Sequence, residues 1–506
     1  MRKKLVLGAT AVALAVGVTL AGCSASKSPS PEKSSAPTTL TLALQAPPSD
    51  FSVGNWGGGD STIYESVYDS LLTQNLKGEL SPGAASAWKS SADGKTLTFT
   101  IRTGQKFSDG EALNAKAVVD SLEVSRKAAG SSAQLKSIAS VSATNSTTVV
   151  VKLSQPDASV LYQLAGSPGV IGAPNSLNSP SAKLDPIGSG PYTLDTAESN
   201  TGSLYVLKKN PKYWNTKAYP FDTVKFEVIA DPTAVQNAME SGQLDWTTLS
   251  SPSLAAQFPS SQFSTGTLLP QAVGALVIVD RTGKVVPALG DVRVRQAINY
   301  ALDRKLISSK LAPGSIPTDQ MANPSGQIFD KALEQNYAFS ISKAKKLMSE
   351  AGYANGFSLT MPSDVLSTTY DATIQQELAA IGIKVTYETE PFQDLFTKLY
   401  SGSYGMFFYY NGYSGSDAKD VGQELSGSFN PFNSTTPKLT SLLSAANSAP
   451  AAKQTAAFAA VNKYLVEQAW FAPLNAATGT WVASKSIKYT PSVVTHISLL
   501  PFAPAN

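Results

Sequence analysis

Strand-like and helix-like segments alternate from about residue 40 to the C-terminus, and this alternation restricts the fold more than any other feature of the sequence. Alternating or β-branched apolar residues predict strands at 39–44, 97–102, 147–153 and 383–387. Apolar residues at helical spacing predict helices at 114–128, 291–305, 341–351 and 374–381. Because the two kinds of segment are interleaved, we expect an α/β fold. The chain has 506 residues, and chains longer than about 250–300 residues normally divide into several domains.

The N-terminus is organised like a secretory signal. Residues 1–4 are cationic, and residues 5–20 contain no charged side chain. This apolar run is shorter than the ~20 residues that usually span a bilayer, which argues against the alternative of a single N-terminal membrane helix. The run ends in Leu-Ala-Gly-Cys, which resembles a bacterial lipobox. We therefore expect residues 1–22 to be a lipoprotein signal peptide and residues 23–39, rich in Ser and Pro, to be a flexible tether.

Cys23 is the only cysteine, so the chain can form no internal disulfide and no Cys-based zinc site. The lipobox resemblance implies that Cys23 is lipidated and begins the mature chain, which would anchor the exported protein at the outer face of the cell membrane. The full chain has 40 basic and 37 acidic residues. Removal of Arg2, Lys3 and Lys4 with the signal leaves a formally neutral chain. We expect no nucleic-acid partner, because nucleic-acid binding needs a clustered basic face.

Few residues support catalysis. His496 is the only histidine and lies in a strand-like segment, where packing at an edge or in a core is the simpler interpretation. One His and one Cys exclude multi-His zinc sites and argue against a Cys–His nucleophile. Gly-x-Ser-x-Gly and Gly-x-x-x-x-Gly-Lys motifs are absent. We expect no enzyme activity, no cofactor and no protein-held metal. A glycosidase with paired carboxylates and a metal carried by an organic chelator stay open.

Six sequence blocks follow the order found in one known family. The first block, residues 80–110, resembles P-x-L-A-x-x-W followed by DGKTYTFxLRxGVKFxDG. Residues 185–192, 209–214 and 238–245 resemble P-V-G-T-G-P-Y, N-x-x-Y-W and A-L-x-S-G-E-I-D. Residues 291–304 match D-V-R-V-R-Q-A-I-x-Y-A-I-D-R closely, and residues 344–353 resemble A-K-x-L-L-x-E-A-G-Y. The chain therefore resembles the family 5 extracellular solute-binding proteins, the oligopeptide, dipeptide and nickel binders of ABC importers.

The resemblance implies a two-lobed α/β fold of the periplasmic-binding-protein kind (type II, cluster C) with an extra subdomain and a hinge. The implied limits are 40–60, 185–250 and 480–506 for a discontinuous lobe I, 61–184 for the extra subdomain, and 251–479 for lobe II. Hinge closure on a ligand would signal occupancy to the permease and ATPase complex in the membrane. We expect a monomer that delivers an oligopeptide or peptide-like solute.

The family blocks are expected to carry structure rather than ligand contacts. Surface ion pairs are expected among the charged residues of the fifth block, Asp291, Arg293, Arg295, Asp303 and Arg304. Gly188, Gly190 and Pro191 suit a tight passage where the chain changes domain, because glycine permits positive φ and proline fixes φ.

Three other stretches combine aromatic and polar residues, as ligand sites do: residues 50–59, 406–417 and 468–475. The candidate ligand-binding residues in them are Asn55, Trp56, Tyr410, Asn411, Tyr413, Ser416, Asp417 and Trp470.

The second stretch decides between two classes of ligand. Peptide-binding members of the family read approximately G-W-x-A-D here, and the resemblance implies that this aspartate binds the peptide's α-ammonium group. Gly412 and Tyr413 fit the first pair, but Ser416 stands at the aspartate's place and Asp417 follows it. Either Asp417 serves after a one-residue shift, or the anchor is absent. Without it a neutral solute such as a sugar fits better, because a buried, unpaired ammonium costs several kcal/mol. The rival function is a surface lipoprotein that keeps the fold for signalling or chaperone-like interactions.

Overall fold

The computed structural model describes residues 38–48, 50–55, 61–494 and 499–505. The signal peptide, almost all of the tether, and the residues Cys23, Trp56 and His496 lie outside these ranges, so the predictions made for them stay predictions. None of the helices within these ranges combines the length and the apolar character needed to cross a membrane.

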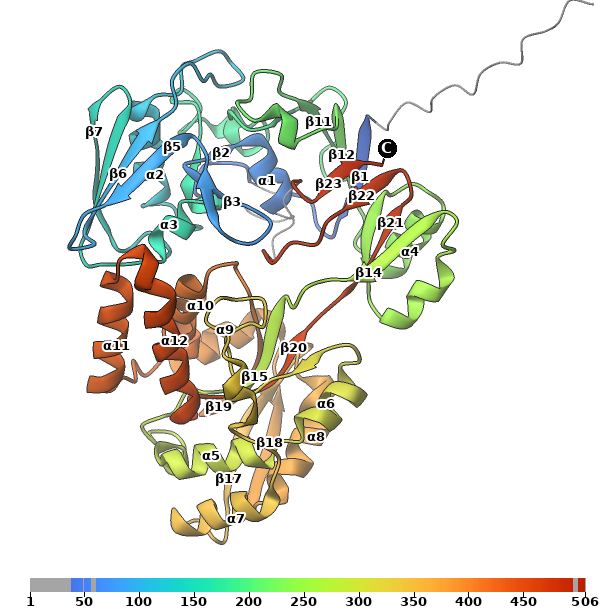
Figure 1. The fold of residues 1–506 in the computed structure, drawn as a ribbon. Coiled ribbons are helices and arrows are strands. Elements are labelled where there is room, and N and C mark those ends of the chain that lie inside the picture. The colour runs from blue at the N-terminus through green and yellow to red at the C-terminus, as the bar shows by residue number, and fades with distance from the viewer. Residues whose placement is uncertain (1–37, 49, 56–60, 495–498, 506) are drawn as a thin grey trace, which may run out of the picture. The chain divides into compact units, whose positions relative to one another are not determined.

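A seven-stranded mixed sheet forms the core of the first lobe (Figure 1). Its strands, in spatial order, are β10 (Tyr192–Leu194), β11 (Leu204–Lys209), β12 (Thr223–Val228), β1 (Thr39–Leu44), β13 (Trp246–Leu249), β21 (Thr480–Ser484) and β14 (Phe263–Thr267). β1 runs parallel to β12 and β13, whereas the other neighbours are antiparallel. The alternation predicted for β1 is confirmed, since Leu40, Leu42 and Leu44 are buried together. Helix α1 (Ser61–Val67) packs on this core, and α4 (Pro232–Glu240) contacts β13.

A four-stranded antiparallel sheet and one long helix form the extra subdomain. The sheet order is β5 (Ala85–Ser90), β6 (Thr96–Ile101), β8 (Thr148–Leu153) and β7 (Ile138–Asn145). Helix α2 (Ala115–Ser125) packs on β7 and β8, and Asn114 Oδ1 caps it by accepting from the backbone N–H of Lys116, as the sequence predicts. The smaller elements are the pairs β2 (Asp69–Ser70) with β9 (Val170–Ile171) and β3 (Leu72–Gln74) with β4 (Leu80–Pro82), and the helix α3 (Val160–Gln163).

The second lobe contains an antiparallel sheet, ordered β16 (Ile316–Pro317), β20 (Phe471–Ala477), β15 (Ala272–Ile278) and β19 (Met406–Gly412), and the parallel pair β17 (Phe357–Ser363) and β18 (Ile383–Thr389). Its helices are α5 (Val292–Ala301), α6 (Arg304–Leu311), α7 (Ile341–Glu350), α8 (Thr368–Ala379), α9 (Phe392–Ser401), α10 (Asp417–Glu424), α11 (Pro437–Ser448) and α12 (Ala451–Glu467). Alternate residues of β15 enter two different hydrophobic cores, Leu276 and Ile278 one of them, Ala275 and Val277 the other. Both faces of this sheet are therefore covered.

The chain crosses between the two sheets at two points that lie side by side (Figure 1). Residues 268–271 join β14 to β15, and residues 478–479 join β20 to β21. The backbone N–H of Leu268 donates to Gly479 O at 2.7 Å, and that of Gln271 donates to Ala477 O at 2.8 Å. Two short, mutually bonded connections are the geometry of a hinge. After the second crossing, β22 (Ile487–Tyr489) pairs with β23 (Phe502–Pro504).

The seven-stranded sheet extends beyond one predicted boundary. The sequence places residues 251–479 in the second lobe, but β14 lies within that range and pairs with β21 along its whole length. The sheet of the first lobe therefore continues to Thr267, and the hinge begins after that residue. The family blocks could not reveal this limit, because β14 and β21 are more than two hundred positions apart in the chain. The other predicted domain limits stay predictions.

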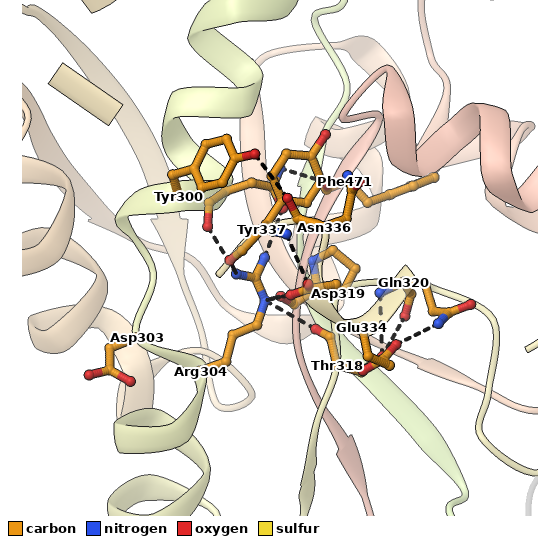
Figure 2. Close-up of polar contacts among 12 residues, drawn as sticks. Tyr300, Asp303, Arg304, Thr318, Asp319, Gln320, Glu334, Asn336, Tyr337 and Phe471 are labelled. Carbon is orange, nitrogen blue, oxygen red and sulfur yellow. Dashed lines mark hydrogen bonds and ion pairs between the residues drawn. The ribbon is translucent and has the colours of Figure 1, made fainter. Parts of the chain in front are cut away.

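The block at 291–304 forms two helices, not one, and its arginines differ in environment. Asp291 caps α5 and Asp303 caps α6, which divides the predicted helix at Leu302. Arg293 pairs with Asp291 on the surface, as the sequence predicts. The surface prediction is wrong for Arg295 and Arg304, which are 5% and 6% exposed. Arg304 pairs with Asp319 at 3.1 Å, a residue that sequence spacing could not bring into view (Figure 2).

Gly188 and Gly190 are required for close packing rather than for positive φ. Neither residue has a positive φ. A Cβ atom on either one would overlap the backbone of Val67 in α1. The two glycines therefore let the chain pass directly over the end of this helix, and a side chain there would displace it.

Candidate functional site

The polar loop predicted after β19 ends in a helix that the sequence reading missed. Ser416 is the N-cap of α10, and its Oγ accepts from the backbone N–H of Lys419 at 3.2 Å. A serine cap followed by two acidic residues in the first turn is an ordinary helix start. It was hidden because α10 is only eight residues long and has Ala418 and Val421 as its few apolar side chains. Ser416 is 2% exposed, so its hydroxyl serves the helix.

Asp417, the first residue of α10, turns its carboxylate toward a neighbouring loop. Oδ2 accepts from the backbone N–H groups of Gln327 at 2.9 Å and Ile328 at 3.3 Å. Oδ1 accepts no hydrogen bond from the described part of the chain, and a Cβ atom at Gly326 would overlap it. Burial raises the pKa of Asp417 from 3.8 to about 6, although the two backbone bonds oppose this shift. One carboxylate oxygen of Asp417 is thus bonded to the backbone, while the other accepts no hydrogen bond from the described residues. The group is ionised at neutral pH.

Two further carboxylates, Asp420 and Glu424, lie along α10 behind Asp417. Asp420 accepts from the backbone N–H of Ser414 at 3.1 Å, and Glu424 accepts from Asn411 Nδ2 at 3.2 Å. Burial raises the pKa of Asp420 to about 7 and that of Glu424 well above its ordinary value. Among the described residues, no group of three or more His, Cys, Asp or Glu side chains is arranged to hold a metal ion. The three acids share a face of α10, because they are three and four residues apart. The sequence reveals this cluster only if the segment is first recognised as a helix.

Four candidate residues of this segment line two small cavities. Asn411, Tyr413 and Asp417 line one small cavity with Asp420 and Glu424. Ser416 joins Tyr413 and Asp417 around a second one. Tyr413 is 5% exposed, and burial with the nearby charge of Asp417 raises the pKa of its hydroxyl. The residues of the segment therefore meet around the carboxylate of Asp417.

The other candidate residues lie elsewhere. Tyr410 hydrogen-bonds through its hydroxyl to Tyr370 and to Asn475 Oδ1, within the second lobe. Trp470 is 3% exposed and packs under the guanidinium group of Arg281, whose central carbon lies 4.2 Å from the ring centre. Asn55 is exposed in the first lobe, and Trp56 lies outside the described residues. The local geometry gives Tyr410 and Trp470 packing roles, which the aromatic character of their segments could not separate from ligand contact.

A cavity of about 570 Å³ lies in the first lobe and was not predicted. It opens where the parallel strands β1, β12 and β13 end, beside the first turn of α4. In open α/β sheets, ligands bind at the carboxyl ends of the strands. None of the described candidate residues is on its wall, which comes from residues 42–46, 62, 226, 229, 230, 232, 235, 236 and 246–250. The polar residues that directly follow β1 and β13 were the available signal, since Gln45 and Ser250 both line the cavity.

Comparison with known proteins agrees with this geometry. Residues 79–433 match the family described as Bacterial extracellular solute-binding proteins, family 5 Middle, and this match covers more than half of the chain. The chain belongs to family 5 of the bacterial extracellular solute-binding proteins. The family 5 blocks found in the sequence are thereby confirmed, as is the two-lobed α/β fold of the type II periplasmic binding proteins.

Three similar proteins illustrate the relationship. The nickel-binding periplasmic protein of Escherichia coli K12 is 28% identical over 370 residues, which cover 68% of this chain and 69% of that protein. The glutathione-binding protein GsiB of Escherichia coli O1:K1 / APEC is 28% identical over 334 residues, 64% of this chain and 63% of GsiB. The match therefore spans less than two thirds of GsiB. The structure of DppA from Helicobacter pylori in complex with the peptide STSA superposes with a TM-score of 0.75 at 21% identity, covering 93% of this chain and 99% of DppA.

In this family 5 protein, the extra subdomain touches the loop that precedes α10. Gln74 Nε2, at the tip of the β3–β4 hairpin, donates to Gly78 O at 3.0 Å and to Gly415 O at 3.3 Å. Gly78 and Gly415 pack backbone to backbone, and a Cβ atom at Gly78 would lie 2.7 Å from Gly415 O. A second contact runs from the backbone N–H of Ala158 to Asn447 Oδ1 at 3.2 Å. The segment that carries Asp417 is thus in direct contact with the part of the chain across the hinge.

This glycine contact predicts a conformational effect of Gly78→Ala. Gly78 has φ +77, so alanine costs about 1–2 kcal/mol in backbone strain and also collides with Gly415. Gly104→Ala is the matched control, because Gly104 has φ +78 and no atom within 4 Å of an added Cβ. Both variants should lose similar stability, but only Gly78→Ala should increase the radius of gyration in small-angle X-ray scattering. Equal scattering from the two variants would mean that the contact does not hold the lobes together.

Proposed function

We propose that this chain is an exported receptor that captures a peptide-like solute by hinge closure and delivers it to the permease and ATPase of an ABC importer, without catalysing a reaction. The observation that carries the proposal is Oδ1 of Asp417, which accepts no hydrogen bond from the described residues and lies in a largely buried segment lined by tyrosine. A carboxylate in such a place suits an ammonium group, since a desolvated ammonium needs an opposite charge. Ser416 is the weaker candidate for this role, because its hydroxyl caps α10.

The relatives support export and a peptide-like ligand. One is named a periplasmic protein and another a glutathione-binding protein, and DppA is seen with a bound peptide. The leader at 1–22 and the lipobox-like Leu-Ala-Gly-Cys support delivery to the outer face of the cell membrane with a lipid anchor at Cys23. A single receptor subunit closing about its own hinge needs no second copy, so we expect a monomer.

The first test is a thermal-shift screen of the mature protein from Thr38 with di- to hexapeptides, uncharged sugars and metal–chelate complexes. A ligand at 100 times its Kd adds about 2.7 kcal/mol to the free energy of unfolding. We expect peptides with a free amine to raise the melting temperature and their N-acetylated forms to fail. A response to sugars or chelates alone would overturn the peptide assignment. No response to any probe would overturn the receptor function and favour a signalling or chaperone-like role.

A further inference from the structure

The 570 Å³ cavity of the first lobe has the size and position of a ligand site. Small-molecule sites usually measure about 300–1,000 Å³. Three parallel strands, β1, β12 and β13, end at this cavity, and residues just beyond each of them form its wall. Trp246 also lines it, and its ring is held in place by packing on Tyr489 and Phe502.

The wall of this cavity carries no charge. Among the described residues that line it there is no Asp, Glu, Lys, Arg or His. Its polar side chains are neutral amides and hydroxyls, those of Gln45, Thr62, Gln236, Thr247, Thr248 and Ser250. A fully charged group that entered would give up water without gaining a counter-charge, which costs several kcal/mol. An uncharged group with hydrogen-bonding atoms would meet both donors and acceptors.

Two acidic groups that adjoin wall residues in the chain are engaged with the backbone. Asp231 caps α4 by accepting from the N–H of Ala234 at 2.8 Å, which supplies that helix end with a negative charge of its own. Asp245 accepts from the N–H of Thr41 at 2.7 Å. Neither residue is on the cavity wall. The helix end therefore does not turn the cavity into an anion site, and no carboxylate makes it a cation site.

We infer that this cavity binds an uncharged, hydrogen-bonding part of the transported solute, such as a neutral amide or hydroxyl side chain, and selects against charged groups at that position. The inference rests on the proposed receptor function and deepens it. Under this inference two sites bind different parts of the ligand. Asp417 supplies the charge that binds an amine, and the neutral cavity of the first lobe binds an uncharged group.

The test uses matched probes on the full mature protein. Tripeptides of alanine with Gln, Glu, Met or Lys at each position in turn, together with the uncharged disaccharides maltose and trehalose, are titrated by calorimetry. At one peptide position we expect Gln to bind at least 10-fold tighter than Glu and Lys, and also tighter than Met, whose thioether is only a weak acceptor. Equal affinities for the neutral and charged peptides at every position would overturn the inference while leaving the receptor function intact.

A charge introduced into the wall tests the same inference by changing the protein instead of the ligand. Thr248 is an exposed residue of β13 on the cavity wall, and Thr100 is an exposed residue of β6 remote from it. Thr248→Glu should bind the Lys peptide at least 10-fold tighter than wild type and the Glu peptide more weakly, whereas Thr100→Glu should change neither. Disaccharide binding that only Thr248→Glu removes would support the inference and overturn the peptide assignment. No binding by any probe would overturn both proposals.

Discussion

Replacement of Asp417 by asparagine is expected to weaken the binding of a free-amine peptide by roughly 30-fold or more. Truncating one partner of a desolvated charge pair costs about 2–5 kcal/mol, and each 1.4 kcal/mol is a factor of ten in Kd. Asparagine keeps the shape of the side chain and one oxygen for the backbone N–H groups of Gln327 and Ile328. The loss should therefore come from the missing charge and not from a collapsed loop. Calorimetric titration of both proteins with the same peptide measures it.

The same substitution should stabilise the ligand-free protein at neutral pH. Burial raises the pKa of Asp417 to about 6, so the folded state favours the protonated acid, whereas the unfolded state ionises near 3.8. Stability from this group is present below pH 3.8 and is lost as the pH rises through about 6. Asparagine carries no charge at any pH. We expect the free energy of unfolding in urea to be about 1–3 kcal/mol higher than wild type at pH 8, and the difference to shrink below pH 6.

The binding of amine ligands should follow the same titration with the opposite sign. An ammonium group needs the ionised carboxylate, so peptide affinity for the wild-type protein should fall as the pH drops through about 6. Asp303→Asn is a suitable control, because Asp303 also accepts a backbone N–H, that of Leu306 at 3.0 Å, and lies on a different helix. That control should bind peptide like wild type. Wild-type affinity in Asp417→Asn would move the amine anchor away from α10.

Local signals in the sequence predicted those elements whose determinants lie close together in the chain. The alternation of Thr39–Leu44, the Asn114 cap and the glycine that ends α7 all act within a few residues, and each appears where expected. Gly352 has φ +88 after α7, a conformation that favours glycine. Family blocks extended this reading to the two-lobed fold, because they mark the order of elements across the chain.

The features that the sequence missed depend on partners far apart in the chain. The cavity wall combines four separate segments, so no single motif describes it. The backbone bonds of Asp417 come from residues about ninety positions away. Helix α10 was missed for a local reason, since it is only eight residues long and Ala418 and Val421 are its few apolar side chains. Aromatic segments were likewise ambiguous: Trp470 serves a buried arginine, whereas Tyr413 lies beside Asp417.

Removal of Arg304 should strongly destabilise the second lobe. Arg304 is 6% exposed and pairs with Asp319 at 3.1 Å. Its guanidinium group also donates to four backbone carbonyls, those of Asn299 at 2.9 Å, Thr318 at 3.1 Å, Pro473 at 2.7 Å and Tyr337 at 3.4 Å. One side chain thus joins α5, β20 and the loop after β16. That loop continues toward Gln327, whose N–H group binds Asp417.

Arg304→Met should lower the free energy of unfolding by about 3–5 kcal/mol, because it leaves the carboxylate of Asp319 buried and unpaired. Arg293→Met is the matched control: Arg293 pairs with Asp291 on the surface, where solvent screens the pair and it contributes little to stability. Urea denaturation of both variants at pH 7 measures the difference.

The double variant Arg304→Met with Asp319→Asn separates the two causes of this loss. If the unpaired charge dominates, removing it should recover a large part of the stability, since an uncharged replacement of a buried ion pair is often tolerated. If the four carbonyl bonds dominate, the double variant should stay as unstable as Arg304→Met, because the carbonyls of Asn299, Thr318, Tyr337 and Pro473 still lack their donor. Equal losses in Arg304→Met and Arg293→Met would contradict the whole account, because burial is what distinguishes the two arginines.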